Sequence, residues 1–173
     1  MLERPKRIHI IGPVGSGKTY LATLLSRELS IPHFQLDNFV WTKTKGNDIR
    51  NPIEVRDKFL KDAIAKDTWI IEGTQHKWTD DSLEMADIII YLLPSILKRD
   101  FSIMKRFIKQ KVGMEKENYR GTIMTLMQLF KWNHQHNHEM MSQKLKPYKE
   151  KVLILKDNRE IMCYINEWNS KRQ

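Results

Sequence analysis

Hydrophobic residues along this chain gather in short runs that alternate with segments of helical period. The first run, residues 8–11, follows a charged lead and is stopped by three glycines between Gly12 and Gly17. This pattern predicts a strand and a turn. From Thr19 onward, leucines recur at spacings of three and four residues, which predicts a helix that ends near Ser30. Residues 33–36 are predicted as a second strand that places Asp37 at its end.

The rest of the chain repeats this alternation. A polar loop at 42–52 ends in a helix start signal, with Asn51 as N-cap, Pro52 at the first position and Glu54 at the third. Strands are predicted at 69–71, closed by Glu72 and Gly73, at 87–93 and at 152–155. Helices are predicted from residue 52, over 95–111, over 122–145 and from about 158 to 168. Parallel strands need crossover connections, so five strands alternating with helices predict a parallel sheet covered on both faces.

Length and composition limit the class of protein. The 173 residues, 40% hydrophobic and 29% charged, suit one domain over residues 1–173. The longest apolar run, residues 88–93, is far short of the roughly 20 residues that span a bilayer. A soluble protein with no membrane partner is therefore expected. One cysteine, Cys163, cannot form an internal disulfide, which favours the reducing cytoplasm. The net charge of +9 suits nucleic acid, membrane or phosphorylated ligands and does not choose among them.

The segment from Gly12 to Thr19, GPVGSGKT, matches the pattern GxxxxGK[ST] between a predicted strand and a predicted helix. Glycines in such a loop let backbone N–H groups converge on phosphate oxygens at a helix N-terminus. We therefore expect Gly12, Gly15, Ser16, Gly17, Lys18 and Thr19 to hold ATP, with Lys18 on the β and γ phosphates and Thr19 on Mg²⁺.

Other parts of the chain narrow the choice among phosphate-binding proteins. The chain has neither a DxxG nor an NKxD segment, which disfavours a GTPase, and the strand at 87–93 does not end in an acidic pair, which disfavours a motor ATPase. A dinucleotide-binding loop would need glycine in place of Val14. A small kinase remains, with ATP in the loop and a second substrate at the ends of neighbouring strands.

Five segments carry a family resemblance: IHIIGPVGSGKT, LDNFVW, WIIEG, ADIIIYLLP and KRDFSIMKR. With them the chain resembles the P-loop kinases described as DNA topology modulation proteins, a branch related to adenylate and shikimate kinases. The resemblance implies a three-layer P-loop NTPase fold, similar to nucleoside monophosphate kinases, with a small helical lid. The chain departs from this family in carrying Glu72 where relatives have Asp, and in lacking an acid before Pro94.

Carboxylates at predicted strand ends are candidates for chemistry. Asp37 could take a proton from a substrate hydroxyl or hold a metal-bound water, or it could simply cap a turn. Glu72 could reach Mg²⁺ through water, or it could be a surface carboxylate beside a glycine turn. The loops after Asp37 and Glu72 choose the acceptor, so Gly73 and Trp41 join the candidate substrate site, with Trp41 stacking on a bound base.

Basic residues concentrate in residues 97–120, which hold eight Lys and Arg against three acids. Arg99 and Arg106 are seven residues apart and share a helix face, which suits a transferring phosphoryl group. The resemblance implies a mobile lid at about 97–121, to which Arg120 would add a substrate contact. A solvated basic face is the alternative for the lysines. Arg56 lies on the inner face of its predicted helix and could meet the phosphate of the second substrate.

The histidines of HQHNH (His134, His136 and His138) invite a metal interpretation. A spacing of two puts His136 across a continuous helix from the other pair, so packed or solvated histidines are favoured.

Three functions stay open: a phosphotransferase using ATP and Mg²⁺ on a small substrate such as a nucleoside monophosphate, a nucleic-acid-associated regulator, and a nucleotide-binding protein without turnover. The sequence leaves the phosphate acceptor and the oligomeric state undetermined.

Overall fold

The computed structural model describes residues 4–42, 44, 48–75, 77–112 and 122–170. Strands lie at β1 Arg7–Ile11, β2 His33–Gln35, β3 Trp41–Thr42, β4 Ile49–Arg50, β5 Trp69–Gly73, β6 Ile88–Leu92 and β7 Val152–Leu155. The α-helices are α1 Lys18–Leu29, α2 Leu36–Val40, α3 Ile53–Ile64, α4 Asp80–Met85, α5 Ile96–Lys111, α6 Ile123–His134, α7 His138–Leu145 and α8 Ile161–Ser170. Two 3₁₀ helices, η1 Lys146–Lys151 and η2 Asn158–Glu160, flank β7.

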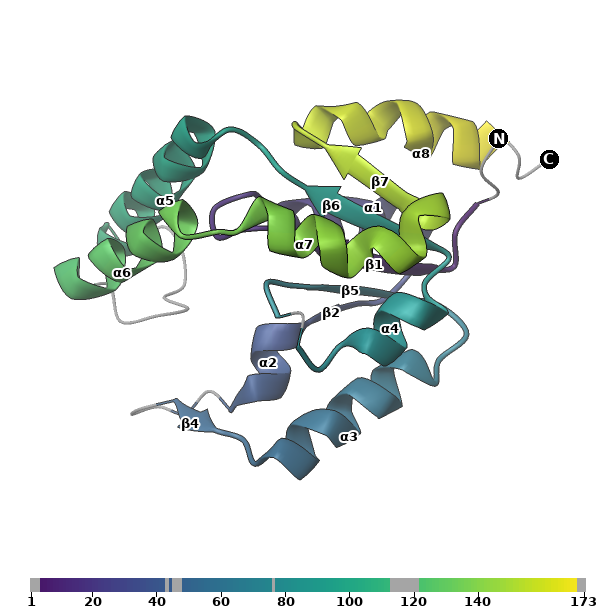
Figure 1. Ribbon diagram of the computed structural model, residues 1–173, viewed down its shortest axis with the longest axis horizontal. Coiled ribbons are helices and arrows are strands. Elements are labelled where there is room, and N and C mark those ends of the chain that lie inside the picture. Colours follow the sequence, from purple (N-terminus) through teal and green to yellow (C-terminus); the bar gives the residue numbers. More distant parts are fainter. Residues whose placement is uncertain (1–3, 43, 45–47, 76, 113–121, 171–173) are drawn as a thin grey trace.

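Five strands form a parallel sheet in the order β2-β5-β1-β6-β7 (Figure 1), which confirms the expected α/β class. Strand β1 is central, between β5 and β6. The next strand in sequence, β2, is not its neighbour, because β5 lies between them. The chain therefore leaves β1 toward one edge of the sheet, where β2 lies, and leaves the neighbouring strand β6 toward the other edge, where β7 lies. The crevice at the carboxyl ends of such strands is where open α/β sheets bind ligands.

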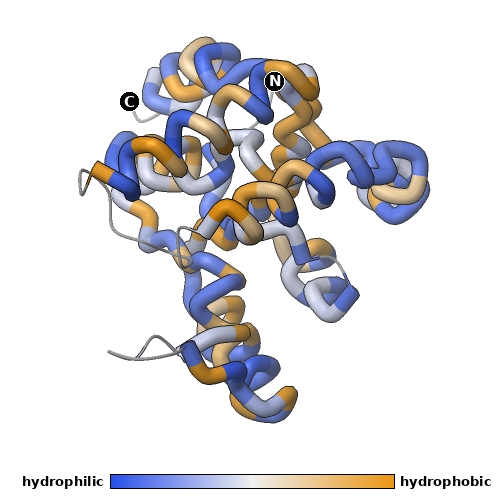
Figure 2. Tube along the Cα trace, turned by 90° about the vertical axis from the view of Figure 1, so that its left-hand side faces the viewer, coloured by the Kyte–Doolittle hydropathy of each residue, from blue (hydrophilic) through white to orange (hydrophobic). Residues whose placement is uncertain are grey.

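Each face of the sheet carries its own apolar core, which makes three layers (Figure 1). On one face, α1 and α8 pack on the sheet through residues such as Leu25, Ile165 and Trp168. On the other face, α2, α3, α4 and α7 contribute residues such as Leu60, Leu83 and Met141. Strands β5 and β6 are buried along their whole length, as expected for strands covered on both sides. Hydrophobic and hydrophilic residues alternate along the outer helices (Figure 2).

Helix α5 leaves most of its apolar stripe exposed. Leu97, Phe101 and Ile108 are more than half exposed, whereas Arg99 and Ile103 on the opposite face are buried. The reason is position: α5 projects past the sheet and packs beside α6 (Figure 1), so no sheet covers its apolar stripe.

Three local expectations also need correction. Asp37 lies in the first turn of α2, not at the end of a strand. The loop at 42–52 contains β4, which pairs with β3 as a two-stranded hairpin. The cap of α3 is Pro52, because Asn51 Oδ1, the atom with which asparagine would cap, instead accepts a hydrogen bond from Thr42 Oγ1 at 2.7 Å.

The helix expected over 122–145 is two helices, α6 and α7, separated by residues 135–137. Asn137 caps α7 by accepting a hydrogen bond from the Met140 N–H. An N-cap residue has non-helical backbone angles, so this cap interrupts the helical period. No helix within the described ranges is long and apolar enough to cross a membrane.

Two leucines test this arrangement of apolar faces. Leu25→Ala removes a side chain that is fully buried between α1 and the sheet, and should lower the free energy of unfolding by about 2–5 kcal/mol. Leu97→Ala makes the same chemical change at a site that is 81% exposed, and should change it by less than about 0.5 kcal/mol. Urea unfolding followed by circular dichroism measures both. Equal losses would mean that α5 buries its apolar stripe after all.

Candidate functional site

The loop of residues 12–17 between β1 and α1 is held by two close approaches that only glycine permits. A Cβ on Gly12 would lie 2.3 Å from the Leu92 carbonyl oxygen at the end of β6. A Cβ on Gly15, whose φ is +76°, would lie 2.7 Å from the Arg99 carbonyl oxygen on α5. The loop is therefore fixed against both β6 and α5, and it delivers the chain into α1 at Lys18.

The Lys18 side chain folds back over this loop and is 8% exposed. Its Nζ donates to the Pro13 carbonyl at 2.8 Å and to Ser16 Oγ at 3.4 Å. Burial lowers the pKa of the Lys18 ammonium to about 8. The ammonium is thus positioned inside the concave side of the loop, where an anion would be paired with it.

Four further charged groups act on Lys18. Beyond the dominant effect of burial, the carboxylates of Glu72 and Asp37 raise the Lys18 pKa. The guanidinium groups of Arg106 and Arg99 lower it. Each charge must lie close to Lys18 to have this effect. The structure therefore brings together, around one lysine, residues from α1, α2, β5 and α5 that were separate candidates in the sequence.

Thr19 and Glu72 are in direct contact. Thr19 Oγ1 donates to Glu72 Oε1 at 2.7 Å. Glu72 is buried at the end of β5, and burial raises the pKa of its carboxyl, which Lys18 and the Thr19 hydroxyl act to lower. A hydroxyl oxygen beside a carboxylate is the hard oxygen donor set that Mg²⁺ prefers, so these residues fit that ion.

Asp37 is positioned by a residue that the sequence did not single out. Gln75 Nε2 donates to Asp37 Oδ1 at 2.6 Å. Gly73 makes room for this contact, because a Cβ there would lie 2.5 Å from Gln75 Oε1 and 2.8 Å from a Leu36 methyl. A glutamine in an irregular segment carries no pattern that marks it as functional.

Arg99 is buried on the inner face of α5, and Arg106, two turns further along the same face, is half-buried. Arg99 is 5% exposed, and its Nη1 donates to the Asn133 carbonyl at 3.4 Å. Among the described residues, Arg99 Nε is buried with no hydrogen-bond partner. Burial lowers the Arg99 pKa. A guanidinium held in this way has donor capacity left for an anion.

A polar network fixes α5 against α6. Asn133, which is buried, donates from Nδ2 to Asp100 Oδ1 at 2.7 Å. His134 Nε2 lies 2.9 Å from the other Asp100 oxygen. The orientation of Arg99 thus depends on contacts made by its sequence neighbour Asp100.

The histidines after α6 converge on a tyrosine. The Tyr91 hydroxyl is hydrogen-bonded to His136 Nε2 at 2.8 Å and to His138 Nδ1 at 3.1 Å. The expectation that His136 and His138 lie across a helix from each other is wrong, because the chain is not helical between α6 and α7. No group of three potential metal ligands occurs within the described part of the chain.

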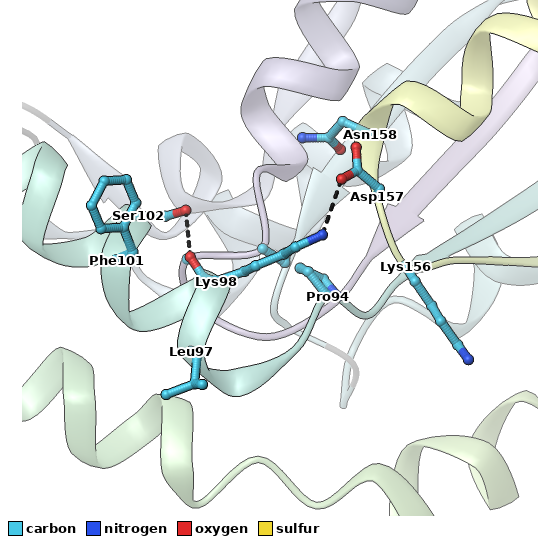
Figure 3. Close-up of a pocket in the computed structure, with 10 residues that line it drawn as sticks. Pro94, Leu97, Lys98, Phe101, Ser102, Lys156, Asp157 and Asn158 are labelled. Carbon is cyan, nitrogen blue, oxygen red and sulfur yellow. Dashed lines mark hydrogen bonds and ion pairs between the residues drawn. The ribbon is translucent and has the colours of Figure 1, made fainter.

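A cavity of about 430 Å³, here called the loop cavity, opens beside the glycine loop (Figure 3). It is lined by Gly15 and Ser16 from the loop, Leu97, Lys98 and Phe101 from α5, and Asp157 from the segment after β7. Lys98 Nζ lies 3.2 Å from Asp157 Oδ2, so an ion pair joins the two sides of the cavity.

A second cavity of about 570 Å³, here called the hairpin cavity, lies between the β3–β4 hairpin, the start of α3 and the segment before α4. It is lined by Trp41, Arg50, Asn51, Arg56, Gln75 and Trp78, among others. Gln75 connects it to Asp37. Trp41 and Arg56 were candidates for the second substrate, whereas Arg50, Gln75 and Trp78 were not. Arg120 lies outside the described residues.

The fold is shared with P-loop kinases of known structure. The alignment with a shikimate kinase from Acinetobacter baumannii, solved in complex with shikimate, covers 99% of this chain and 97% of that one, with a TM-score of 0.53 and 14% identity. The alignment with a gluconokinase from Sinorhizobium meliloti 1021 covers 98% and 94%, with a TM-score of 0.52 and 12% identity. Identities this low show a shared fold. The chain therefore has the α/β P-loop NTPase fold of the shikimate kinase and gluconokinase type.

Sequence similarity covers less of the chain. Over 89 residues it is 33% identical to the uncharacterized protein YqaC of Bacillus subtilis (strain 168), a match that spans 50% of this chain and 48% of that protein. The match thus spans about half the length of this curated relative. No family model matches the chain. The resemblance to DNA topology modulation proteins stays a prediction.

The α5–α6 network is tested by comparing two of its members. Asn133→Ala removes a buried amide that donates to the half-buried Asp100 carboxylate, and should reduce the free energy of opening of α5 by about 1–3 kcal/mol. His134→Ala removes an exposed partner of the same carboxylate and should cost no more than about 1 kcal/mol. Hydrogen exchange of the α5 amides reports both values. If the two variants exchange alike, Asn133 does not anchor α5.

Proposed function

We propose that this protein is an ATP-dependent phosphotransferase that acts on a small acceptor. One observation carries the proposal: buried Lys18 donates from Nζ to the Pro13 carbonyl inside the glycine loop, and the next residue, Thr19, is hydrogen-bonded to the buried carboxylate of Glu72 at the end of β5. The carboxylate of Asp37 and the guanidinium groups of Arg99 and Arg106 also act on Lys18. Phosphoryl transfer is catalysed chiefly by positioning and charge neutralisation, and it needs this combination of cations and carboxylates around a phosphate-binding loop.

The glycine loop and the loop cavity form the donor side. Phosphate oxygens would take the place of the Pro13 carbonyl and Ser16 hydroxyl as partners of Lys18. The base and ribose would enter the loop cavity, where Phe101 and Leu97 offer apolar surface (Figure 3). Thr19 and Glu72 would hold Mg²⁺, which neutralises charge on the β and γ phosphates when bound.

The carboxylate of Asp37 faces the acceptor side. In the proposed step an acceptor oxygen forms a bond to the γ-phosphorus while the bond from phosphorus to the β–γ bridging oxygen breaks, and ADP leaves. If the acceptor is a hydroxyl, its proton passes to Asp37, which Gln75 holds in place. Arg99 and Arg106 neutralise charge on the transferring group. Trp41, Arg56 and Gly73 belong to the acceptor side through the hairpin cavity and the end of β5.

Helix α5 would form the fixed base of the lid expected at about residues 97–121, of which residues 113–121 lie outside the described part of the chain. It contacts the glycine loop at Gly15 and carries both arginines on its inner face. Closure of the rest of the lid over this base would exclude water, while the two arginines of α5 are held beside the glycine loop.

The donor side is tested with Lys18→Ala. This change removes the ammonium inside the loop and should weaken ATP binding by about 10- to 100-fold, the cost of a hydrogen bond to a charged group. Isothermal titration calorimetry with ATP and Mg²⁺ measures the affinity. The control is Lys61→Ala, which removes an exposed lysine on α3 and should leave the affinity unchanged. Equal ATP affinities in the Lys18→Ala and Lys61→Ala variants would mean that ATP does not bind at the glycine loop.

Turnover is tested by a coupled assay for ADP release across nucleosides, nucleoside monophosphates, shikimate-like acids and sugars. For an acceptor that supports turnover, Asp37→Asn should lower kcat by about 100-fold or more and leave ATP affinity nearly unchanged. Asparagine can still accept the Gln75 hydrogen bond, so the change isolates the charge and the proton acceptor. Asp62→Asn, on the exposed face of α3, is the control. An Asp37→Asn variant as active as the wild type would make Asp37 a structural residue. If none of the acceptors supports ADP release, the protein is a nucleotide binder without turnover.

A further inference from the structure

The hairpin cavity has a chemical character that narrows the acceptor class. We propose that the acceptor carries a nucleobase, as a nucleoside or a nucleoside monophosphate, and that the base packs on the flat surfaces that Trp41 and the Arg56–Trp78 pair present to this cavity. The inference rests on the proposed function, because it concerns the second substrate of the same reaction.

Two indole rings line the cavity from separate elements. Trp41 comes from β3 and Trp78 from the segment before α4. Trp41 is 39% exposed although it is a large aromatic residue, and it belongs to a hairpin of only two residues per strand. Each base has a π-face, so indole rings that line a cavity form a stacking surface for any of them.

Arg56 can contact a ligand in the hairpin cavity through the planar face of its guanidinium, whereas its charge is already balanced. Its Nε and Nη2 both donate to Asp57 Oδ1, at 2.8 and 2.6 Å, so the neighbouring carboxylate balances its charge. Its guanidinium carbon lies 4.4 Å from the centroid of the Trp78 ring. The guanidinium and the indole are therefore stacked, and Asp57 holds the guanidinium in that position. This arrangement favours a flat, uncharged ring over a phosphate at Arg56.

Polar groups at the rim suit the edge of a base. Arg50, Asn51 and Gln75 all line the cavity and supply donors and amide oxygens. The Asn51 amide is fixed by the Phe39 carbonyl and the Thr42 hydroxyl, which bond its Nδ2 and Oδ1 at 2.9 and 2.7 Å. A pocket of flat apolar walls with a few fixed polar groups is the usual form of a site for a planar ligand.

Size and position are consistent with a nucleoside. The cavity volume of about 570 Å³ falls within the range of about 300–1,000 Å³ seen for small-molecule sites. Gln75 reaches from this cavity to Asp37, and Asp37 acts on the Lys18 pKa. A base in the hairpin cavity would therefore direct its sugar or phosphate toward Asp37 and the glycine loop. Sugar acids have no flat ring to fill the aromatic part of the cavity.

The experiment uses the full chain with ATP, Mg²⁺ and two groups of probe acceptors. One group contains the common nucleosides and their 5′-monophosphates, and the other contains shikimate and gluconate. Release of ADP and transfer of labelled γ-phosphate to the acceptor are measured together. We expect transfer to at least one member of the first group, with a kcat/KM at least about 10-fold above that for shikimate or gluconate. Transfer to shikimate or gluconate alone would overturn this inference and leave the proposed phosphotransferase standing. No transfer to any probe would overturn both.

Two tryptophan variants then locate the base. Trp41→Leu and Trp78→Leu should each raise KM for the nucleobase acceptor by about 10-fold with little change in kcat, because a stacking contact is lost. Trp41→Phe should restore most of the loss, which separates stacking from misfolding. The matched control is Trp132→Leu, a half-exposed tryptophan on α6 that does not line the cavity and should leave KM unchanged. A KM equal to the wild type in both Trp41→Leu and Trp78→Leu would overturn the placement of the base.

Discussion

The close approach of the glycine loop to its two neighbours is the constraint on which the rest of the site depends. At Gly12 the loop meets the carbonyl at the end of β6, and at Gly15 it meets a carbonyl of α5. Both contacts leave no room for a side chain, so the loop, the sheet and α5 have fixed relative positions. Because α5 carries Arg99 and Arg106, the same contacts bring these cations within range of Lys18. The glycine contacts that shape the loop for a phosphate therefore also position the charged side chains around it.

Much of the fold follows from local patterns in the sequence. The strands β1, β5, β6 and β7 are found where apolar runs predicted them. The pattern is clearest in β5 and β6, because strands covered on both faces are largely apolar along their length. The glycine loop is equally local, since its geometry depends on a few consecutive residues. Both features could be read without knowing what packs against them. The helix break before His138 could not be predicted in this way, because the helical spacing of apolar residues continues on both sides of the Asn137 cap.

The parts of the site that the sequence did not reveal depend on tertiary contacts. Helix α5 has an apolar stripe that suggests burial, but its position beyond the sheet leaves Phe101 exposed and turns Arg99 inward. Gln75 and Trp78 lie in an irregular segment and gain their place only because β5 delivers them beside α2 and α3. The ion pair of Arg56 with Asp57 could have been predicted, because the two residues are adjacent in the sequence. The stacking of Arg56 on Trp78 could not, because it joins two segments that are distant along the chain.

The ion pair between Lys98 and Asp157 has a consequence for how the loop cavity opens. It connects α5 to the segment after β7, and the Lys98 side chain is 60% exposed. Solvent-exposed pairs contribute at most about 1 kcal/mol and are screened by dissolved salt. Separating the two walls at this point therefore costs little compared with moving α5 away from the buried contacts at Gly15 and Asn133. The solvent-exposed side of the loop cavity is closed by the Lys98–Asp157 ion pair, and its inner side is held by the buried contacts of α5. A change in ionic strength would therefore alter the width of the cavity opening more readily than the position of Arg99 and Arg106.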